Sequence, residues 1–183
     1  MTTSAEQAPE GLRARLENGS LAGDWALDPA RSTATLRSKS IWGLVTVNGV
    51  FGRIEGGGAV SPAGEVTGQI ALPTDALDTK NKKRDTHLRS GDFFLTEKYP
   101  AITFALDKLA PADDGVTVSG TLTVREASRP ISFPATVTLT GDNEVTLDAT
   151  VHIDRSEFGL SFNQMGMMSM KNTVTMHAVF TKS

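Results

Sequence analysis

The sequence contains no cysteine, which excludes disulfides, a thiolate nucleophile and zinc or iron–sulfur sites held by cysteine. It has one tyrosine and two tryptophans, and it has no apolar run of the length that crosses a membrane as a helix. Its 18 basic residues do not outnumber its 21 acidic ones, so the formal net charge is −3. We therefore expect neither a nucleic-acid partner, which would call for a basic surface, nor a membrane span.

Residues 1–22 form a polar lead without the apolar core of a signal peptide, so we expect a cytoplasmic protein. Within this lead, Gly11–Glu17 is expected to form a short helix, because leucines spaced four apart precede the stop signal Asn18-Gly19. The helix either lies against the rest of the chain or moves freely. Residues 23–183 are expected to form one domain, since this length can bury a sizeable core.

From Trp25 onward, apolar residues alternate with polar ones, which indicates strands with one buried and one wet face. The alternating runs cover residues 66–72, 102–106, 116–124, 131–139, 145–153 and 174–180. Many such antiparallel strands have to hide their edges, and closing into a barrel achieves this. The glycines between Gly49 and Gly58 fit a strongly bent strand pair. The prediction is an all-β antiparallel barrel, and a two-sheet sandwich stays open as the alternative.

The segment Asp78–Tyr99 interrupts this alternation and is expected to form a lid or cap on the barrel. Asn81 is a suitable N-cap for a short helix over Lys82–Arg89, which would end near Ser90-Gly91. Aromatic residues follow this helix before the next strand begins. They give the segment an apolar side.

Polar residues of this segment are the candidates for chemistry, namely Asp78, Asn81, Arg84, Asp85 and His87. Asp85 and His87 stand two apart on a helical turn, so they point in different directions and would not form an acid–base pair. We expect this polar cluster to hold the helix on the barrel by hydrogen bonds. A binding protein is therefore favoured over an enzyme, and an enzyme centred on Asp85 and His87 remains the weaker alternative.

The candidate metal ligands do not stand at ligand spacing. The three histidines, His87, His152 and His177, lie far apart in the sequence, and the two on strands are expected to face outward. Thioethers clustered in Met165–Met170 can bind Cu(I), but they also make adaptable apolar surface, which is the interpretation we favour. We expect no metal and no cofactor.

Several longer motifs together resemble the YceI-like family. They are W-A-L-D-P-A-R-S (Trp25–Ser32), G-V-F-G-R-I-E-G-G-G (Gly49–Gly58), the block D-T-x-N-x-x-R-D-x-H-L-x-S-x-D-F-F (Asp78–Phe94), Y-P-x-I-x-F (Tyr99–Phe104), G-T-L-T-V (Gly120–Val124) and I-D-R-S-E-F-G-L (Ile153–Leu160). The resemblance covers the chain from about Asp24 to its end. The chain departs from the family pattern at Arg31 and over Arg125–Ser128, where many relatives carry histidine.

The resemblance implies an extended lipocalin-like antiparallel barrel, and some members of the family enclose a long polyisoprenoid chain. We accordingly expect a hydrophobic small molecule, an isoprenoid or lipid chain, as the partner. The expected ligand-binding residues are Trp42, Leu44, Phe51, Phe93, Phe94, Phe104, Phe133, Phe158, Phe162, Met165 and Met168. Because periodicity does not distinguish a hollow barrel from a packed one, an interaction or stress-response module without ligand stays as the alternative. Family members often dimerise, which makes a homodimer a further expectation.

Overall fold

The computed structural model describes residues 9–112 and 115–183. The elements are α1 (Pro9–Glu17), β1 (Gly23–Leu27), β2 (Thr33–Ser40), β3 (Val45–Phe51), β4 (Glu55–Val60), β5 (Val66–Pro73), η1 (Thr74–Ala76), β6 (Leu77–Asp78), α2 (Lys82–Leu88), β7 (Ala101–Ala112), β8 (Gly115–Val124), β9 (Ala127–Thr140), β10 (Glu144–Asp154), η2 (Arg155–Phe158), η3 (Gln164–Gly166) and β11 (Lys171–Lys182). The two helices are short, and both were expected from the sequence.

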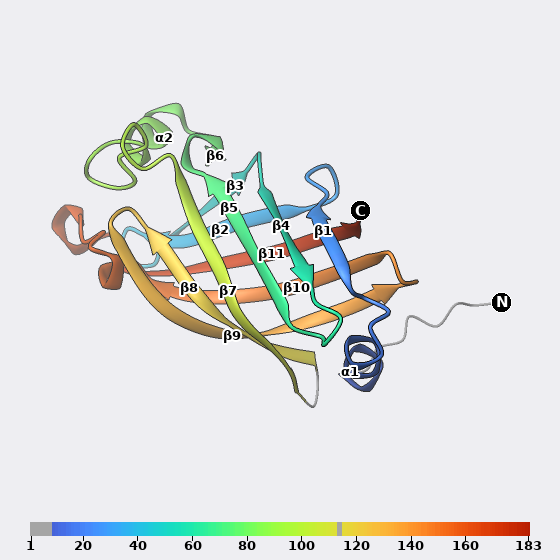
Figure 1. Ribbon diagram of the computed structural model, residues 1–183. Helices are drawn as coiled ribbons and strands as arrows, with labels where there is room; N and C mark the ends of the chain where they lie inside the picture. The colour runs from blue at the N-terminus through green and yellow to red at the C-terminus, as the bar shows by residue number, and fades with distance from the viewer. Residues whose placement is uncertain (1–8, 113–114) are drawn as a thin grey trace.

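Eight strands close into an antiparallel barrel in the order β1, β4, β5, β7, β8, β9, β10, β11 and back to β1 (Figure 1). Closure depends on β1 and β11, which pair through Trp25 with Lys182 and through Leu27 with Phe180. The prediction of an all-β antiparallel barrel is confirmed, and the sandwich alternative is wrong. Closure removes the unpaired edges that two separate sheets would leave.

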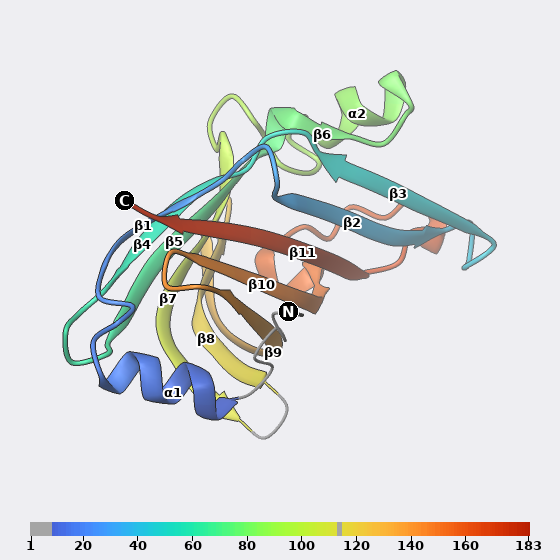
Figure 2. The same cartoon turned by 90° about the vertical axis from the view of Figure 1, so that its right-hand side faces the viewer.

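The barrel is extended at one end because the edge of β11 that pairs with β1 also pairs with β2. Its first half pairs with β2, from Asn172 opposite Ser38 to His177 opposite Thr33. Strands β3 and β6 continue the sheet from β2. Figure 2 shows β1 and β4 on one side of the molecule and β2 and β3 on the other. The two ends of the barrel are therefore built from different strands.

The glycines of β4 allow its neighbours to approach closely. A Cβ at Gly58 would overlap the carbonyl oxygen of Thr67 on β5, and one at Gly57 would lie 2.9 Å from that of Trp25 on β1. A side chain at either position would push the strands apart. The glycines of β4 are thus needed for close strand packing, while the strong bend expected from them stays a prediction.

Helices α1 and α2 lie at opposite ends of the barrel (Figures 1 and 2). Leu12 and Leu16 of α1 are buried in one half of the core, together with Val118 of β8. The Arg15 guanidinium donates a hydrogen bond of 2.6 Å to the carbonyl oxygen of Gly141 in the turn between β9 and β10. Of the two arrangements expected for this helix, the structure shows the one in which it lies against the barrel.

Candidate functional site

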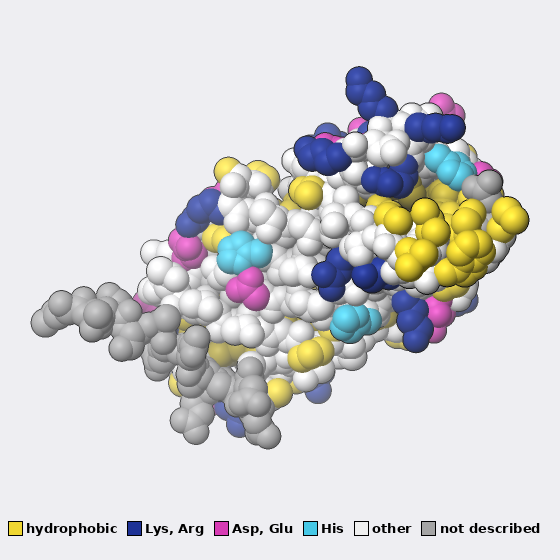
Figure 3. All heavy atoms as spheres, turned by 180° about the vertical axis from the view of Figure 1, so that it is seen from behind, with side chains coloured by type: hydrophobic (Ala, Val, Ile, Leu, Met, Phe, Trp, Pro, Cys, Tyr) yellow, Lys and Arg dark blue, Asp and Glu magenta, His cyan; other side chains and the backbone are white. Residues whose placement is uncertain are grey.

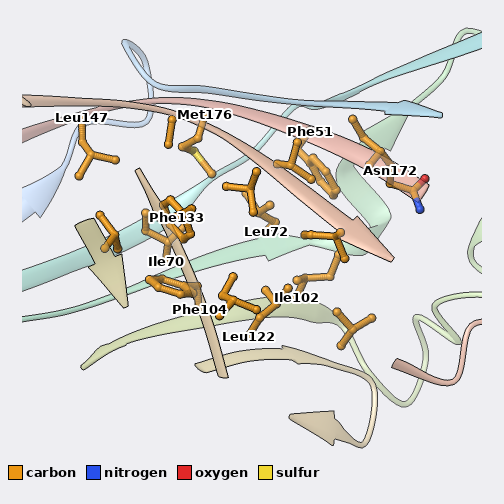
Figure 4. Close-up of a pocket in the computed structure, with 18 of the residues that line it drawn as sticks. Phe51, Ile70, Leu72, Ile102, Phe104, Leu122, Phe133, Leu147, Asn172 and Met176 are labelled. Atoms are coloured by element: carbon orange, nitrogen blue, oxygen red, sulfur yellow. The ribbon is translucent and has the colours of Figure 1, made fainter. Parts of the chain in front are cut away.

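The barrel encloses a cavity of about 510 Å³ that runs between its two ends. Figure 4 shows side chains from opposite walls pointing into this space. Ten of the residues around it are labelled there, namely Phe51, Ile70, Leu72, Ile102, Phe104, Leu122, Phe133, Leu147, Asn172 and Met176. Nearly all of these side chains are apolar, so the cavity offers a ligand apolar contact and few hydrogen bonds.

The cavity wall follows from strand alternation. The alternating apolar faces predicted for β5, β7, β8, β9, β10 and β11 all contribute lining residues. Phe104 on β7 and Phe133 on β9 meet in the interior, with ring centroids 5.6 Å apart and planes tilted by 55°. Phe104 packs against both halves of the core. These two rings therefore lie where the two halves of the cavity join.

The end of the cavity under α1 is closed by apolar side chains. Leu12, Leu16, Leu21 and Trp25 line this end, and each is at least nine-tenths buried. The Trp25 indole Nε1–H donates a hydrogen bond of 2.9 Å to the carbonyl oxygen of Leu21, so its polar atom is satisfied. Among residues 9–112 and 115–183, no residue that lines this end carries a charge.

The other end is covered by the α2 segment, whose polar residues bond to one another and to Thr79 within the segment. The Asn81 side chain caps the helix by accepting from the backbone N–H of Arg84 at 3.0 Å. The carboxylate of Asp85 is buried and accepts from the backbone N–H (3.0 Å) and the hydroxyl (2.5 Å) of Thr79. The Arg84 guanidinium in turn donates to the hydroxyl (2.8 Å) and the carbonyl oxygen (2.7 Å) of Thr79.

Asp78 begins this segment, and a hydrogen bond from the backbone N–H of Lys80 lowers the pKa of its carboxyl group. The turn between β8 and β9 holds the far part of the lid, because Arg125 donates to the carbonyl oxygens of Gly91 and Phe93 at 3.0 and 3.1 Å. The rings of Phe93 and Phe94 are buried, and both residues line the cavity.

Asp85 and His87 do not contact each other as an acid–base pair, in agreement with their spacing. His87 Nε2 lies 2.8 Å from a carboxylate oxygen of Asp92. The His87 ring also makes edge contacts with Phe93 and Phe162, at centroid distances of 5.1 and 4.9 Å. His87 is thus part of an aromatic group beside the cavity.

Basic residues gather at the α2 end of the cavity. The cations Lys39, Arg84 and Arg155 line it there together with His87, and no Asp or Glu of the described residues lines it anywhere. Arg155, at the start of η2, is 8% exposed and was not among the expected site residues. Arg155 is the arginine of the I-D-R-S-E-F-G-L motif, and no local pattern marks it as a site residue.

The structure places the expected ligand-binding residues in three kinds of position. Most line the cavity, namely Phe51, Phe93, Phe94, Phe104, Phe133, Phe158 and Met168. Phe162 packs against the core beside Phe93, with ring centroids 5.5 Å apart. Trp42, Leu44 and Met165 lie on the surface, 67%, 83% and 79% exposed. These three do not line the cavity.

The fold and the cavity define a class of protein, a closed lipocalin-like antiparallel barrel that encloses an apolar space. The family model for the YceI-like domain matches residues 25–181, and the chain belongs to this family. No helix among the described residues is long and apolar enough to cross a membrane.

Sequence relatives cover a limited stretch of the chain. Protein YceI of Escherichia coli O17:K52:H18 is 35% identical over 66 residues, which are 36% of this chain and 35% of that protein. A UPF0312 protein of Pseudomonas aeruginosa LESB58 is 33% identical over 67 residues, or 37% of this chain and 35% of that protein. The matched part spans about a third of each of these relatives.

Two solved structures share the fold over most of the chain. BcnA of Burkholderia cenocepacia superposes with a TM-score of 0.75 at 24% identity, covering 84% of this chain and 98% of its own. A polyisoprenoid binding domain from Saccharophagus degradans gives a TM-score of 0.68 at 18% identity, covering 87% of this chain and 98% of its own. At these identities the likeness shows the fold alone.

Proposed function

We propose that this protein binds a long apolar molecule, an isoprenoid or lipid chain, inside the barrel and acts as its carrier or store. The observation that carries the proposal is the cavity of about 510 Å³ with its nearly all-apolar wall. Cavities of this size are typical of small-molecule sites, whereas ordinary protein interiors have few voids larger than a water molecule. The cavity thus favours a ligand over the alternative of a packed interaction module.

The energetics of such a site depend on apolar burial. Each buried methylene group contributes about 0.8 kcal/mol, so a tail of about ten carbons gains roughly 8 kcal/mol before the cost of immobilising it. Few polar contacts are then needed. The polyisoprenoid binding domain of S. degradans, which has the same fold, supports the isoprenoid class.

A charge placed in the middle of the cavity tests this proposal. Phe104→Glu puts a carboxylate where Phe104 meets Phe133, and we expect it to abolish uptake of a polyisoprenoid or fatty acid, since a buried unpaired charge is costly. Ala105→Glu is the matched control, because Ala105 is the exposed neighbour on the same strand. Circular dichroism establishes that both variants fold. Undiminished uptake by a folded Phe104→Glu variant would contradict the assignment.

The natural cargo is identified by native mass spectrometry of protein purified gently from its own host, followed by organic extraction. We expect an added mass that partitions into the solvent. An apo mass that persists after incubation with isoprenoids and with fatty acids would overturn the proposal in favour of a module without ligand.

A further inference from the structure

The charge of the cavity wall is one-sided. The ionisable residues that line it, in the part of the chain that the structure describes, all belong to the α2 end and are all basic, whereas the α1 end is lined by apolar residues such as Leu12, Leu16 and Trp25. A cavity that received hydrocarbon alone would need no charge. The distribution matches an amphiphile whose tail lies under α1 and whose polar group lies under α2.

Arg155 is the most enclosed of these cations. Its Nη1 donates to the carbonyl oxygen of Leu160 at 2.6 Å and its Nε donates to that of Ser169 at 3.0 Å. Its Nη2 is buried and has no hydrogen-bond partner among the described residues. Burial lowers the pKa of Arg155, but an arginine side chain stays protonated in proteins. The guanidinium is therefore charged and incompletely paired.

No carboxylate among the described residues forms an ion pair with Arg155. Asp154, its neighbour in the chain, acts on it through space, but this carboxylate accepts from the backbone N–H and the hydroxyl of Ser156 instead. The Phe93 ring lies 5.6 Å from the guanidinium carbon, which provides a weaker cation–π contact. A buried cation without a counterion costs free energy, and an anion brought beside it offsets that cost.

We propose that the α2 end of the cavity binds the anionic head group of an amphiphile, a carboxylate or a phosphate, with Arg155 as its principal counter-charge. Lys39 supplements the charge at the rim, where its Nζ donates to the hydroxyl of Thr46 at 2.7 Å. Low dielectric in the interior strengthens the attraction. Direct contact with Nη2 requires a small shift of the side chains around it. The proposal rests on the proposed function and adds the class of head group.

The test compares three ligands with one tail, namely geranylgeranyl phosphate, geranylgeranoic acid and geranylgeraniol, by calorimetry at neutral pH. Because hydrogen bonds to charged groups are stronger than neutral ones, we expect at least one anion to bind roughly tenfold to 100-fold more tightly than the alcohol. Comparison of the acid with the phosphate then shows which head group fits. Equal affinities for all three ligands would overturn the head-group proposal alone, whereas no binding of any of them would overturn the proposed function.

Variants locate the charge that matters. Arg155→Gln is expected to remove the preference for the anions, so that the three ligands bind with similar affinity. Lys39→Gln should reduce the preference by a few-fold, and it keeps the test decisive if Arg155→Gln does not fold. Lys108→Gln is the matched control, because Lys108 is an exposed lysine of β7 outside the cavity wall. A preference that survives in a folded Arg155→Gln variant would contradict the assignment to Arg155.

The rim of the barrel at the α2 end also exposes apolar side chains. The turn between β2 and β3 exposes apolar side chains, Ile41 by 43%, Trp42 by 67% and Leu44 by 83%, and Met165 of η3 is 79% exposed. Backbone bonds tie the turn to the methionine segment, with Trp42 N–H donating to the carbonyl oxygen of Met167 at 3.2 Å. Figure 3 shows an apolar patch of this kind at one end of the molecule, with several lysine and arginine side chains and fewer acidic ones near it.

The turn between β2 and β3 has a strained backbone, and the charged residues of this hairpin are basic. Ile41 and Trp42 have φ angles of 49° and 51°, in the left-handed region that is costly for residues other than glycine. Strands β2 and β3 and the turn between them carry two cations, Arg37 and Lys39, and no acidic residue. Arg31 and Arg53 lie at the other end of this hairpin and are paired with Asp28 and Glu144 and with Asp75. Ile41 also lines the cavity, so the patch continues into the ligand space.

We infer that this rim patch docks on an anionic lipid surface, where a ligand can pass between membrane and cavity. Tryptophan beside basic residues suits the interface of a bilayer with anionic lipid. Two copies meeting through the same patch would bring their cations together, which opposes association. A bilayer therefore fits this surface better than a second copy of the chain.

Fluorescence of Trp42 tests the docking. Trp25→Phe leaves Trp42 as the one tryptophan, and its emission is expected to shift to the blue with vesicles of phosphatidylcholine and phosphatidylglycerol, and less with phosphatidylcholine alone. Co-sedimentation of the full chain with the same vesicles should fall several-fold for Leu44→Ser and not for Val50→Ser, which is 45% exposed at the other end of β3. The absence of binding to either vesicle would overturn the inference. A dimer that Leu44→Ser dissociates would also overturn it, in favour of a second copy.

Discussion

The two tryptophans of the chain mark the two ends of the barrel, and their surroundings differ in almost every respect. Trp25 is 7% exposed, its indole N–H is bonded, and it closes an apolar end under α1. Trp42 is 67% exposed on a strained turn at the cationic end under α2. One end thus has the character of a hydrophobic core and the other that of a binding surface.

This difference between the two ends favours one orientation of an amphiphilic ligand in the cavity. At the α1 end, removal of apolar area from water is the sole contribution that a ligand can gain. At the α2 end, Arg155 and Lys39 add an electrostatic term that an uncharged group does not use. An amphiphile satisfies both ends when its tail lies under α1 and its head under α2, and the following changes test that direction.

Removal of the two tryptophans should give the largest contrast. Trp25→Ala is expected to lower the free energy of unfolding by about 3–5 kcal/mol, because it leaves a cavity in the core. Trp42→Ala should change it by less than about 0.5 kcal/mol, as is usual for an exposed side chain. Urea unfolding measures both. Similar losses for the two variants would show that the ends do not differ as described.

Filling the α1 end should shorten the tail that the cavity accepts. Val137 on β9 lines this end, and Val137→Trp would occupy space for about four methylene groups, worth roughly 3 kcal/mol or about a 100-fold loss in affinity. We expect the loss for a long-tailed fatty acid and little change for a short one. Thr136→Trp, on the exposed face of the same strand, is the control. An equal loss for both tail lengths would place the tail elsewhere.

Loss of the helix cap should act on the lid alone. Asn81→Ala removes the acceptor of the Arg84 N–H and is expected to cost about 1 kcal/mol. Hydrogen exchange should show faster opening of α2 while amides of the barrel strands keep their protection. Asn81→Asp keeps a capping oxygen and should restore the protection. Faster exchange throughout the barrel would contradict a lid that opens on its own.

Acid should lower the stability of the protein in part through Asp154, the residue before Arg155. A hydrogen bond from the Ser156 hydroxyl, with help from its backbone N–H, lowers the pKa of the Asp154 carboxyl group. A carboxyl group with a lowered folded-state pKa stabilises the protein above its unfolded-state pKa, and this contribution disappears as the pH falls through the folded-state pKa. Asp154→Asn should therefore reduce the acid-induced loss of stability slightly, as measured by thermal unfolding at pH values from about 6 to 3. An unchanged profile would contradict this role.

Strand alternation predicted the inward faces because a half-buried strand has to repeat every two residues. Capping preference predicted the cap at Asn81, and helical spacing predicted the separation of Asp85 from His87, because both depend on local geometry. The sequence did not predict that Trp42 and Leu44 face outward, since a turn has no period and large apolar residues are usually buried. The position of Arg155 depends on tertiary contacts with Leu160 and Ser169, which no local pattern specifies.

The direction of the ligand is tested most directly by quenching Trp25 with fatty acids that carry a nitroxide at one of two places. In the Trp42→Phe variant, Trp25 is the one tryptophan, and it lines the closed end of the cavity. We expect stearic acid labelled at the end of its tail to quench Trp25 strongly, and stearic acid labelled next to its carboxylate to quench it weakly. Stronger quenching by the label beside the carboxylate would contradict a tail under α1 and a head group under α2.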